Sequence, residues 1–419
     1  MRQDMATVFE FPGVVGDGRN DDTDGLQAAL DSSGASTVFL PAPPRNYLIS
    51  RTLVVHSGQA LVADRNAVIR LADHAHAYML TNADRENGDR RITVTGGIWD
   101  GNNLHQTCDY HQQGGTWRVP YDPKRYLGVL MQFNRVQDLR VAHVTFKDPE
   151  TFGFQGGNLE RFTIEDITFD YNLRRANMDG VHINGNCHQG RIANLKGTTN
   201  DDLVALNADE GAMYEISRGP ITDIQVDGIW APNGYTAVRL LSAGSPIRRV
   251  KLSNIFGTYR YNVVSFTNHR VHPGAASTFY DVSIEGVFCS KSVMDMDVPA
   301  FGPPWSGFAQ IWIDAPAVIS NLLVRDYHRT EATLPADDVH IEPGAIVENL
   351  VLDDVTLENR CAAPISLLHN RGTMGNLALL NVYAKAEGAS PGGHIVQNAG
   401  TISRSHQTNL TAIGFEVGI

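Results

Sequence analysis

The chain has 419 residues, 42% of them hydrophobic, and a formal net charge of −12 at pH 7. This length and composition support a large globular core, whereas an acidic chain without a basic run is a poor candidate for nucleic-acid binding. No apolar run reaches 18 residues, so we expect no membrane span. No CxxC motif joins the four cysteines, which we expect to be buried free thiols: Cys108, Cys187, Cys289 and Cys361.

The N-terminal region combines a short helix with strands. The first residues, MRQDMATVFEFPG, contain no apolar signal core, so we expect a soluble protein, cytoplasmic or exported with its signal removed. Residues 16–34 read GDGRNDDTDGLQAALDSSG, which predicts one helix. We expect it to start at Asp22 or Thr23 and to stop at Gly34. Residues 36–71 predict strands split by a proline-rich turn, and a helix across the first coil would cover open strand edges.

From residue 139 onward a short pattern returns nine times: apolar, any, apolar, any, any, apolar. The copies are short, rich in β-branched residues and followed by Asn, Gly or Asp, which predicts strands with tight turns. Successive copies lie 23 to 40 residues apart, and a second strand register, such as GVHI and LVAL, lies between them. The stretch ITVTGGIWDGN reads as an earlier copy. The middle apolar residues of the nine copies, here called anchors, are Val141, Ile164, Ile192, Val226, Leu252, Ile284, Val324, Leu352 and Leu379.

This repeat predicts an all-β fold, a single-stranded parallel β-helix with an N-terminal capping helix. A β-sandwich is the alternative, but its strands usually recur as hairpins every 8–12 residues or so. We expect one domain over residues 1–419, with the cap and first coils at 1–75 and further coils over 76–419. Two long insertions between coils are expected at 109–126 and 295–308.

Two acidic strand entrances stand one coil apart. NMDGVHI at 177–183 contains Asp179, and NDDLVAL at 200–206 contains Asp201 and Asp202. Because stacked coils lie about 4.8 Å apart, the 22 residues between Asp179 and Asp201 should bring the three carboxylates onto one surface. A lone aspartate at a strand entrance is often only a turn residue. Three neighbouring carboxylates instead repel one another, which suits the acid and base of glycosidic-bond cleavage.

Other polar residues are candidates for substrate binding. Arg239 and His182 alternate with apolar neighbours and should point outward. His269 and His272, in TNHRVHPG, would border the same face and could supply hydrogen-bond donors. Their spacing resembles a metal-binding pair, but no third ligand is apparent, so we expect no metal and no other cofactor.

The two long insertions and a short acidic stretch add further candidates. Trp117 and Trp305 lie in the insertions, where exposed aromatic rings suit the apolar faces of sugars or pack a loop onto the coils. Asp209 and Glu210, in NADEG, are further candidate acids. An aspartate at such a position also commonly serves only as a turn residue.

Two N-terminal stretches, VVGDGRNDDTDGLQAAL and VFLPAPPRNYLI, resemble the cap of right-handed β-helix carbohydrate enzymes. The best-known members are the glycoside hydrolases of family 28, the polygalacturonases. The resemblance implies a right-handed, pectate-lyase-like β-helix over nearly the whole chain. It also covers the Asn-x-Asp and Asp-Asp entrances, and it implies that Asp201 is the general acid while Asp179 and Asp202 hold the water.

The chain departs from the family pattern at two places. The family continues with Gly-His-Gly and Arg-x-Lys, but no Gly-His-Gly occurs here, and Leu241 stands where a lysine would follow Arg239. In that family, the histidine and the lysine that are missing here help the enzyme to bind galacturonate. The resemblance therefore supports cleavage of a carbohydrate more firmly than it supports a uronate substrate.

The leading hypothesis is an inverting glycoside hydrolase whose partner is a poly- or oligosaccharide substrate. One alternative is a polysaccharide lyase on the same scaffold, with Arg239 or His182 as base, although lysine, a common lyase base, is scarce. Another is a non-catalytic carbohydrate-binding or tailspike-like module, because the fold does not fix the function. The sugar, the linkage and the oligomeric state are not predicted.

Overall fold

The computed structural model describes most of the chain, namely residues 5–32, 36–108, 126–211, 215–269, 272, 274–293, 308–388 and 390–418. These residues form two compact units. Unit 1 holds the described residues of Met1–Asp201 and Gly211–Arg218, and unit 2 holds those of Asp202–Glu210, Gly219–Met296 and Phe301–Ile419. The single domain expected over the whole chain stays a prediction.

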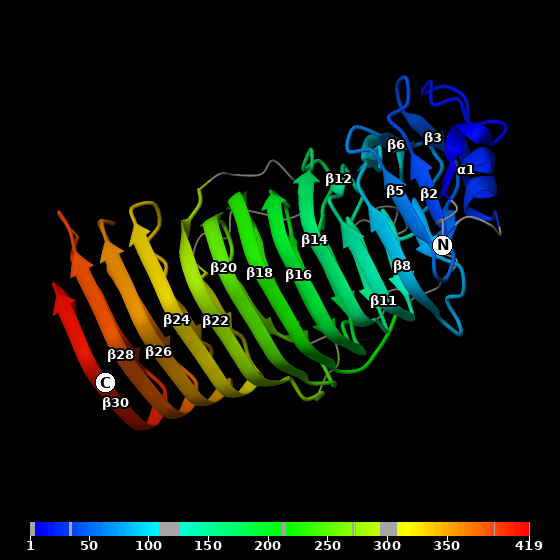
Figure 1. Ribbon diagram of the computed structural model, residues 1–419. Helices are drawn as coiled ribbons and strands as arrows, with labels where there is room; N and C mark the ends of the chain where they lie inside the picture. Colours follow the sequence, from blue (N-terminus) through cyan, green and yellow to red (C-terminus); the bar gives the residue numbers. More distant parts are fainter. Residues whose placement is uncertain are drawn as a thin grey trace. The chain divides into compact units, whose positions relative to one another are not determined.

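The cap of unit 1 consists of β1 (Met5–Thr7), the 3₁₀-helix η1 (Val8–Glu10) and α1 (Thr23–Leu30), drawn in blue in Figure 1. In the described part of the chain α1 is the only α-helix. The described residues contain no helix with the length and hydropathy that a membrane crossing requires.

The helix α1 starts at Thr23, directly after its N-cap residue Asp22, as predicted. The Asp22 carboxylate accepts hydrogen bonds from the backbone N–H of Val15 at 2.6 Å and of Leu48 at 2.9 Å, so it ties the helix to the first coil. Asp22 itself is fully buried. The helix ends at Leu30, and Gly34, its predicted stop, lies outside the described residues.

Two parallel sheets build the coils of unit 1, which also contains the 3₁₀-helix η2 (Asn103–His105). The first sheet contains β1, which pairs with β2, and the following strands: β2 (Thr37–Leu40), β3 (Tyr47–Ile49), β5 (Ala60–Ala63), β6 (Val68–Leu71), β8 (Asp89–Thr95), β9 (Ile98–Asp100), β11 (Val136–Ala142), β12 (Thr145–Lys147), β14 (Glu160–Asp170) and β16 (Cys187–Gly197). Those of the second are β4 (Leu53–Val55), β7 (Leu80–Asn82), β10 (Met131–Asn134), β13 (Phe154–Gly157) and β15 (Val181–Asn184).

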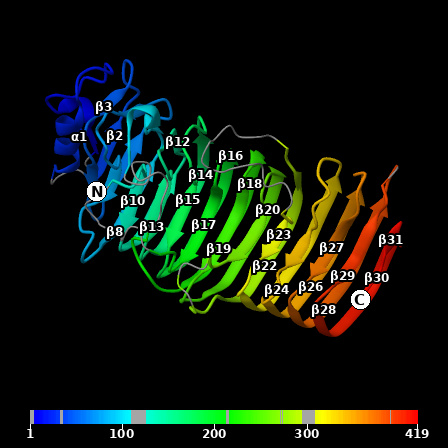
Figure 2. The same cartoon turned by 180° about the vertical axis from the view of Figure 1, so that it is seen from behind.

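Unit 2 has the same arrangement. Its first sheet contains β18 (Ile221–Gly234), β20 (Ile247–Tyr259), β22 (Thr278–Lys291), β24 (Val318–Glu331), β26 (Ile346–Asn359), β28 (Thr373–Ala386) and β30 (Thr401–Ile413). Its second sheet, visible in Figure 2, contains β17 (Asp202–Ala208), β19 (Thr236–Ser242), β21 (Val264–Thr267), β23 (Ile311–Ile313), β25 (Val339–Ile341), β27 (Ile365–Asn370), β29 (Gly393–Asn398) and β31 (Phe415–Glu416).

The anchors lie opposite one another on neighbouring strands. In unit 1, Val94 of β8 is opposite Val141 of β11, and Ile164 of β14 follows in the same register, so the earlier copy belongs to the repeat. Ile192 of β16 completes this series. In unit 2 one register joins the other six anchors: Val226, Leu252, Ile284, Val324, Leu352 and Leu379. The predicted repeat is confirmed within each unit, and the fold is the predicted right-handed parallel β-helix.

A bend in the backbone explains the spacing of the sequence pattern. The residue two positions after each anchor has a positive φ, for example 56° at Asp166 and 69° at Gly286. Gly, Asn and Asp enter this left-handed region more readily than other residues. The bend turns the third apolar residue back to the interior, so Ile164 and Ile167 are both fully buried although three positions separate them.

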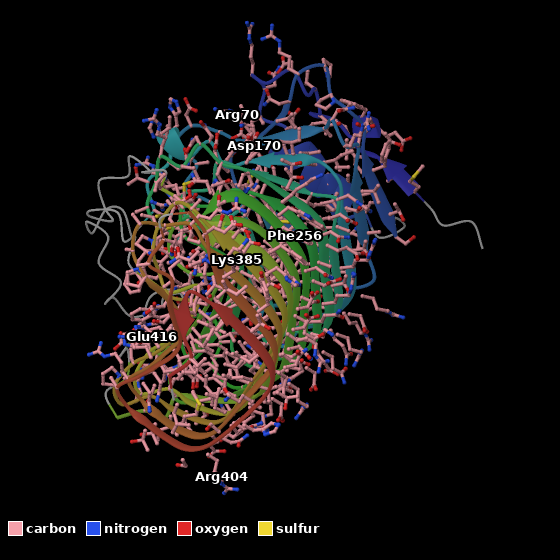
Figure 3. All side chains as sticks on the ribbon, turned by 90° about the vertical axis from the view of Figure 1, so that its left-hand side faces the viewer. Arg70, Asp170, Phe256, Lys385, Arg404 and Glu416 are labelled. Carbon is pink, nitrogen blue, oxygen red and sulfur yellow. The ribbon has the colours of Figure 1, made fainter. Side chains whose placement is uncertain are left out.

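Apolar side chains make up most of the interior of both units, and a smaller number of polar side chains are buried with them. Figure 3 views the coils of unit 2 from their C-terminal side, where the exposed Arg404 of β30 points away from the interior. The four cysteines are buried thiols outside any disulfide, as predicted.

Candidate active site

Asp179 lies just before β15 in unit 1, and both its side chain and its backbone make hydrogen bonds there. Its carboxylate oxygen Oδ2 is 2.7 Å from Nδ1 of His182, and both side chains are fully buried. The His182 ring stacks on Phe152 with ring centroids 4.1 Å apart. The backbone carbonyl of Asp179 accepts hydrogen bonds from the N–H of Gly153 at 3.1 Å and from the hydroxyl of Tyr171 at 3.0 Å. The position of this carboxylate is therefore fixed from both its side chain and its backbone.

Asn200, the first residue of NDD, connects the two acidic strand entrances. Its Oδ1 accepts a hydrogen bond from the N–H of Met178 at 2.9 Å, and its Nδ2 donates to the carbonyl of Arg175. The next residue, Asp201, has a carboxylate oxygen within 4.8 Å of one from Asp179. Asp201 is 6% exposed. Two carboxylates thus meet in unit 1 in a site largely shielded from water.

Asp202 is the first residue of β17 in unit 2, and Arg239 of β19 holds its side chain. Nε of Arg239 is 2.8 Å from Oδ2 of Asp202, and another guanidinium nitrogen is 3.9 Å from Oε1 of Glu210. Asp202 and Glu210 are both buried. A planar guanidinium with several donors can bind two carboxylates at once and keep them in a fixed orientation.

His269 supports Arg239 as a neutral acceptor. Its Nε2 lies 3.2 Å from a guanidinium nitrogen of Arg239, which can only donate, so the ring proton sits on Nδ1. That nitrogen faces the hydroxyl of Thr267 at 3.4 Å. The side chain keeps an exposed surface, yet loss of hydration and then the charge of Arg239 lower the pKa of His269. His269 therefore stays neutral at neutral pH and orients the arginine.

The other candidate residues fall into three groups. Trp117 and Trp305 lie outside the described residues. His272 is half-buried, and its carbonyl accepts a turn hydrogen bond from the N–H of Ala275 at 3.0 Å. Asp209 is a backbone cap, because its two carboxylate oxygens accept from the N–H of Gly219 at 2.9 Å and of Ser245 at 2.7 Å. A carboxylate used in this way is a poor candidate for an acid or a base.

Sequence reasoning missed a row of outward-facing side chains in unit 2. These residues occupy the same position on successive strands of the second sheet, and we call them the outer row: Arg239, Ser265, Trp312, His340, His369 and Gln397. Trp312 is half-buried, and its ring stacks on His340 with centroids 4.6 Å apart. The alternation in AQIWI and DDVHI places these side chains outward, by the argument used for Arg239.

Comparison with known proteins links part of the chain to a carbohydrate-active family. Residues 87–219 match the model of the glycosyl hydrolases family 28, and this segment contains Asp179, Asp201 and Asp202. The resemblance expected from the sequence is thereby confirmed over this segment. No curated protein matches the chain.

Solved structures with the same fold differ in their functions. The A-module of a mannuronan C-5 epimerase from Azotobacter vinelandii is 12% identical, with a TM-score of 0.61, and the match covers 98% of both chains. A family 28 exopolygalacturonase from Yersinia enterocolitica is 16% identical, with a TM-score of 0.57, over 97% of this chain and 78% of that one. A surface protein and adhesin of Streptococcus pneumoniae is 14% identical, with a TM-score of 0.54, over 99% and 100%. At such identities the likeness concerns the fold alone.

Proposed function

We propose that this protein is a glycoside hydrolase that cleaves glycosidic bonds in a poly- or oligosaccharide. Asp201 would protonate the leaving oxygen, while Asp179 and Asp202 would orient the attacking water. The observation that carries the proposal is the pair of shielded carboxylates of Asp179 and Asp201, within 4.8 Å of each other. The match to the family 28 model over all three aspartates supports it.

The chemistry requires one protonated and one ionised carboxyl group. Glycoside hydrolases obtain this difference from a pair of carboxyl groups that stand in different surroundings. The closest oxygens of Asp179 and Asp201 are nearer than the roughly 6.5–9.5 Å typical of the carboxyl groups in inverting enzymes. Inversion therefore rests on the family resemblance, and the anomer of the first product, followed by NMR, would decide it.

Arg239 and His182 would act on the aspartates rather than on the bond that breaks. Arg239 holds Asp202, and His182 holds Asp179. Neither side chain is placed as an unpaired base, which weighs against the lyase alternative. Leu241 is fully buried and apolar, so this position supplies no cation for a uronate carboxylate. We propose a neutral or differently decorated sugar as the substrate, with Trp117, Trp305, His269 and His272 as candidate contacts.

Asp201→Asn tests the proposal because it removes the acidic proton and keeps the size of the side chain. We expect turnover of a responsive oligosaccharide, chosen from a defined panel, to fall by about 10²–10⁴-fold. Release of reducing ends measures it. Asp138→Asn is the matched control, because Asp138 lies on the surface of unit 1 and pairs with Arg161.

Three results would contradict the proposal. Full turnover by Asp201→Asn would remove the acid role from that residue. Products that absorb ultraviolet light as unsaturated sugars would identify a lyase. Binding of oligosaccharides without any product, across the whole panel, would favour a non-catalytic module.

A further inference from the structure

We propose that Asp337, His340 and His369 of unit 2 bind a divalent transition-metal ion, with Zn²⁺ as the expected type. Asp337 directly precedes Asp338 and the strand β25, which carries His340, and His369 lies on the neighbouring strand β27. His340 and His369 are directly opposite each other in the parallel pairing. The register of two coils therefore brings together residues that are distant in the sequence.

The distances between the three side chains suit a single ion. Oδ2 of Asp337 is 2.9 Å from Nδ1 of His369 and 3.8 Å from Nδ1 of His340. One potential ligand atom from each of the three residues lies within 4.8 Å of the other two. Two ligands at about 2.1 Å from a tetrahedral Zn²⁺ lie about 3.4 Å apart, so the cluster needs only small side-chain movements.

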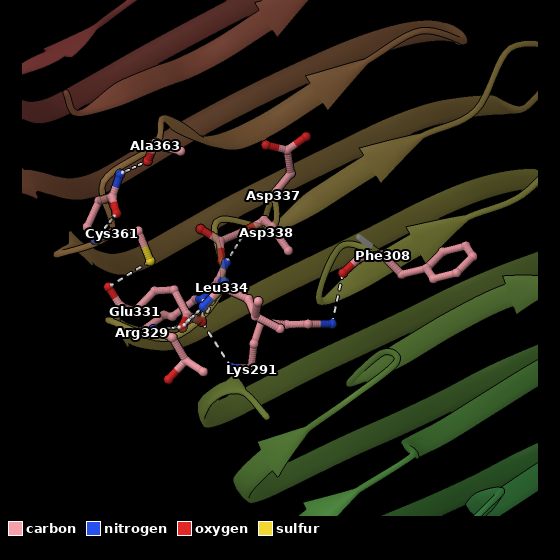
Figure 4. Close-up of polar contacts among 12 residues, drawn as sticks. Lys291, Phe308, Arg329, Glu331, Leu334, Asp337, Asp338, Cys361 and Ala363 are labelled. Carbon is pink, nitrogen blue, oxygen red and sulfur yellow. Dashed lines mark hydrogen bonds and ion pairs between the residues drawn. The ribbon is translucent and has the colours of Figure 1, made fainter. Parts of the chain in front are cut away.

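The backbone directs the Asp337 carboxylate toward the histidines. Figure 4 shows that Asp337 points away from its neighbour Asp338, whose carboxylate binds the guanidinium of Arg329. The second oxygen of Asp337 accepts a hydrogen bond from the N–H of Ser366 at 2.8 Å, which fixes the carboxylate and leaves Oδ2 facing His369. Asp337 is therefore oriented separately from the buried ion pair beside it.

The surroundings of His340 also support a metal site. It is 8% exposed, and its Nε2 is buried without a hydrogen-bond partner among the described residues. Such a group is costly unless something satisfies it. Nε2 lies 3.6 Å from Oε1 of Glu342. A metal bound at Nδ1 would turn the Nε2–H toward this carboxylate, which matches the carboxylate partner that metal-bound histidines usually have.

The ligand types select the metal. Two imidazoles and one carboxylate suit Zn²⁺ and its first-row neighbours, whereas Ca²⁺ and Mg²⁺ prefer oxygen ligands. A histidine nitrogen must be free of its proton to bind a metal ion, so affinity should decrease as the pH falls. The alternative is a metal-free hydrogen-bonded cluster, which would show no preference among these ions.

The test uses the full chain without an affinity tag, stripped with a chelator. We expect one equivalent of Co²⁺ to bind with a visible absorption band, and Zn²⁺ to displace it, whereas Mg²⁺ does not. His369→Ala and Asp337→Asn should weaken binding by at least about 10–100-fold. The control is His406→Ala, because His406 is exposed on β30 and lies outside the cluster. No substrate is involved, so the result does not depend on the proposed function.

The wild-type titration alone can overturn the proposal. If the stripped protein binds neither Co²⁺ nor Zn²⁺, the cluster is not a metal site, whatever the variants do. Equal binding by the wild type and by folded His369→Ala and Asp337→Asn would also overturn it. Circular dichroism confirms the folding of each variant, and Asp337→Asn keeps the size of the side chain and the acceptor for Ser366.

Discussion

Lys291 is a buried cation at the end of β22, beside a network of charged side chains (Figure 4). It is 1% exposed, and its ammonium donates to the backbone carbonyls of Tyr261 and Phe308. Its backbone N–H donates to Glu331, which also binds the buried Arg329. Burial, and then the charge of Arg329, lower the pKa of Lys291 to about 7. A buried lysine with so low a pKa makes the stability of the fold sensitive to pH.

Lys291→Met tests this sensitivity. Because the unfolded lysine has a pKa near 10.4, the folded chain binds fewer protons above pH 7, so the free energy of unfolding rises with pH. Lys291→Met lacks this contribution. Between pH 7 and 8.5, the slope of the free energy of unfolding against pH should therefore decrease by up to about 1.4 kcal/mol per pH unit. Urea denaturation at several pH values measures it. The exposed Lys251→Met should keep the wild-type slope, and an equal slope in Lys291→Met would refute the assignment.

Charged residues were the least predictable part of the molecule. Lysine and arginine are usually solvent-exposed, so Lys291 and Arg329 carried no sign of burial in the sequence. Their burial depends on Glu331 and Asp338, and the strand pattern does not show which charges will meet. The proximity of Asp179 and Asp201 was easier to predict, because both residues stand at the same point of the coil repeat.

At the scale of elements, the anchors could be predicted because each coil must bury the same apolar positions. The bends could be predicted only in part. Gly, Asn and Asp follow most anchors, but the sequence does not show that they have a positive φ. The histidines of the proposed metal site were missed for a different reason. His340 and His369 are outward-facing, and only the exact strand pairing shows that they are opposite each other.

Asp354 offers a test of the bend. It follows the anchor Leu352 by two positions, is exposed and has a φ of 55°. Asp354→Val places a β-branched residue in the left-handed region and should lower the free energy of unfolding by about 1–2 kcal/mol. Asp354→Asn removes the same charge but tolerates this φ, so it should stay close to the wild type in urea denaturation. Equal stability of the two variants would exclude backbone strain as the reason for the pattern.

At the scale of the whole molecule, the boundary between the two compact units runs through the NDD stretch. The peptide bond between Asp201 and Asp202 is one of the places where the chain passes from unit 1 to unit 2. The candidate acid and the aspartate held by Arg239 therefore belong to different units, although they are neighbours in the chain. The single-domain prediction can be tested by measuring whether the two units unfold together.

Calorimetry tests that prediction directly. If residues 1–419 form one domain, heating should give one transition, with the calorimetric enthalpy equal to the van't Hoff enthalpy. Asp354→Val, in unit 2, should then shift the entire transition to lower temperature. Two transitions, of which this substitution moves only one, would show two independently folding domains.

The side chains of the outer row are regularly spaced along the surface of unit 2. Each strand contributes one position, and neighbouring positions are about 4.8 Å apart, so the row from Arg239 to Gln397 extends for about 24 Å. Gain or loss of one complete coil would lengthen or shorten the row by a single step and leave the remaining side chains in register. The length of such a surface can therefore change in fixed steps, while the remaining side chains keep their identity and spacing.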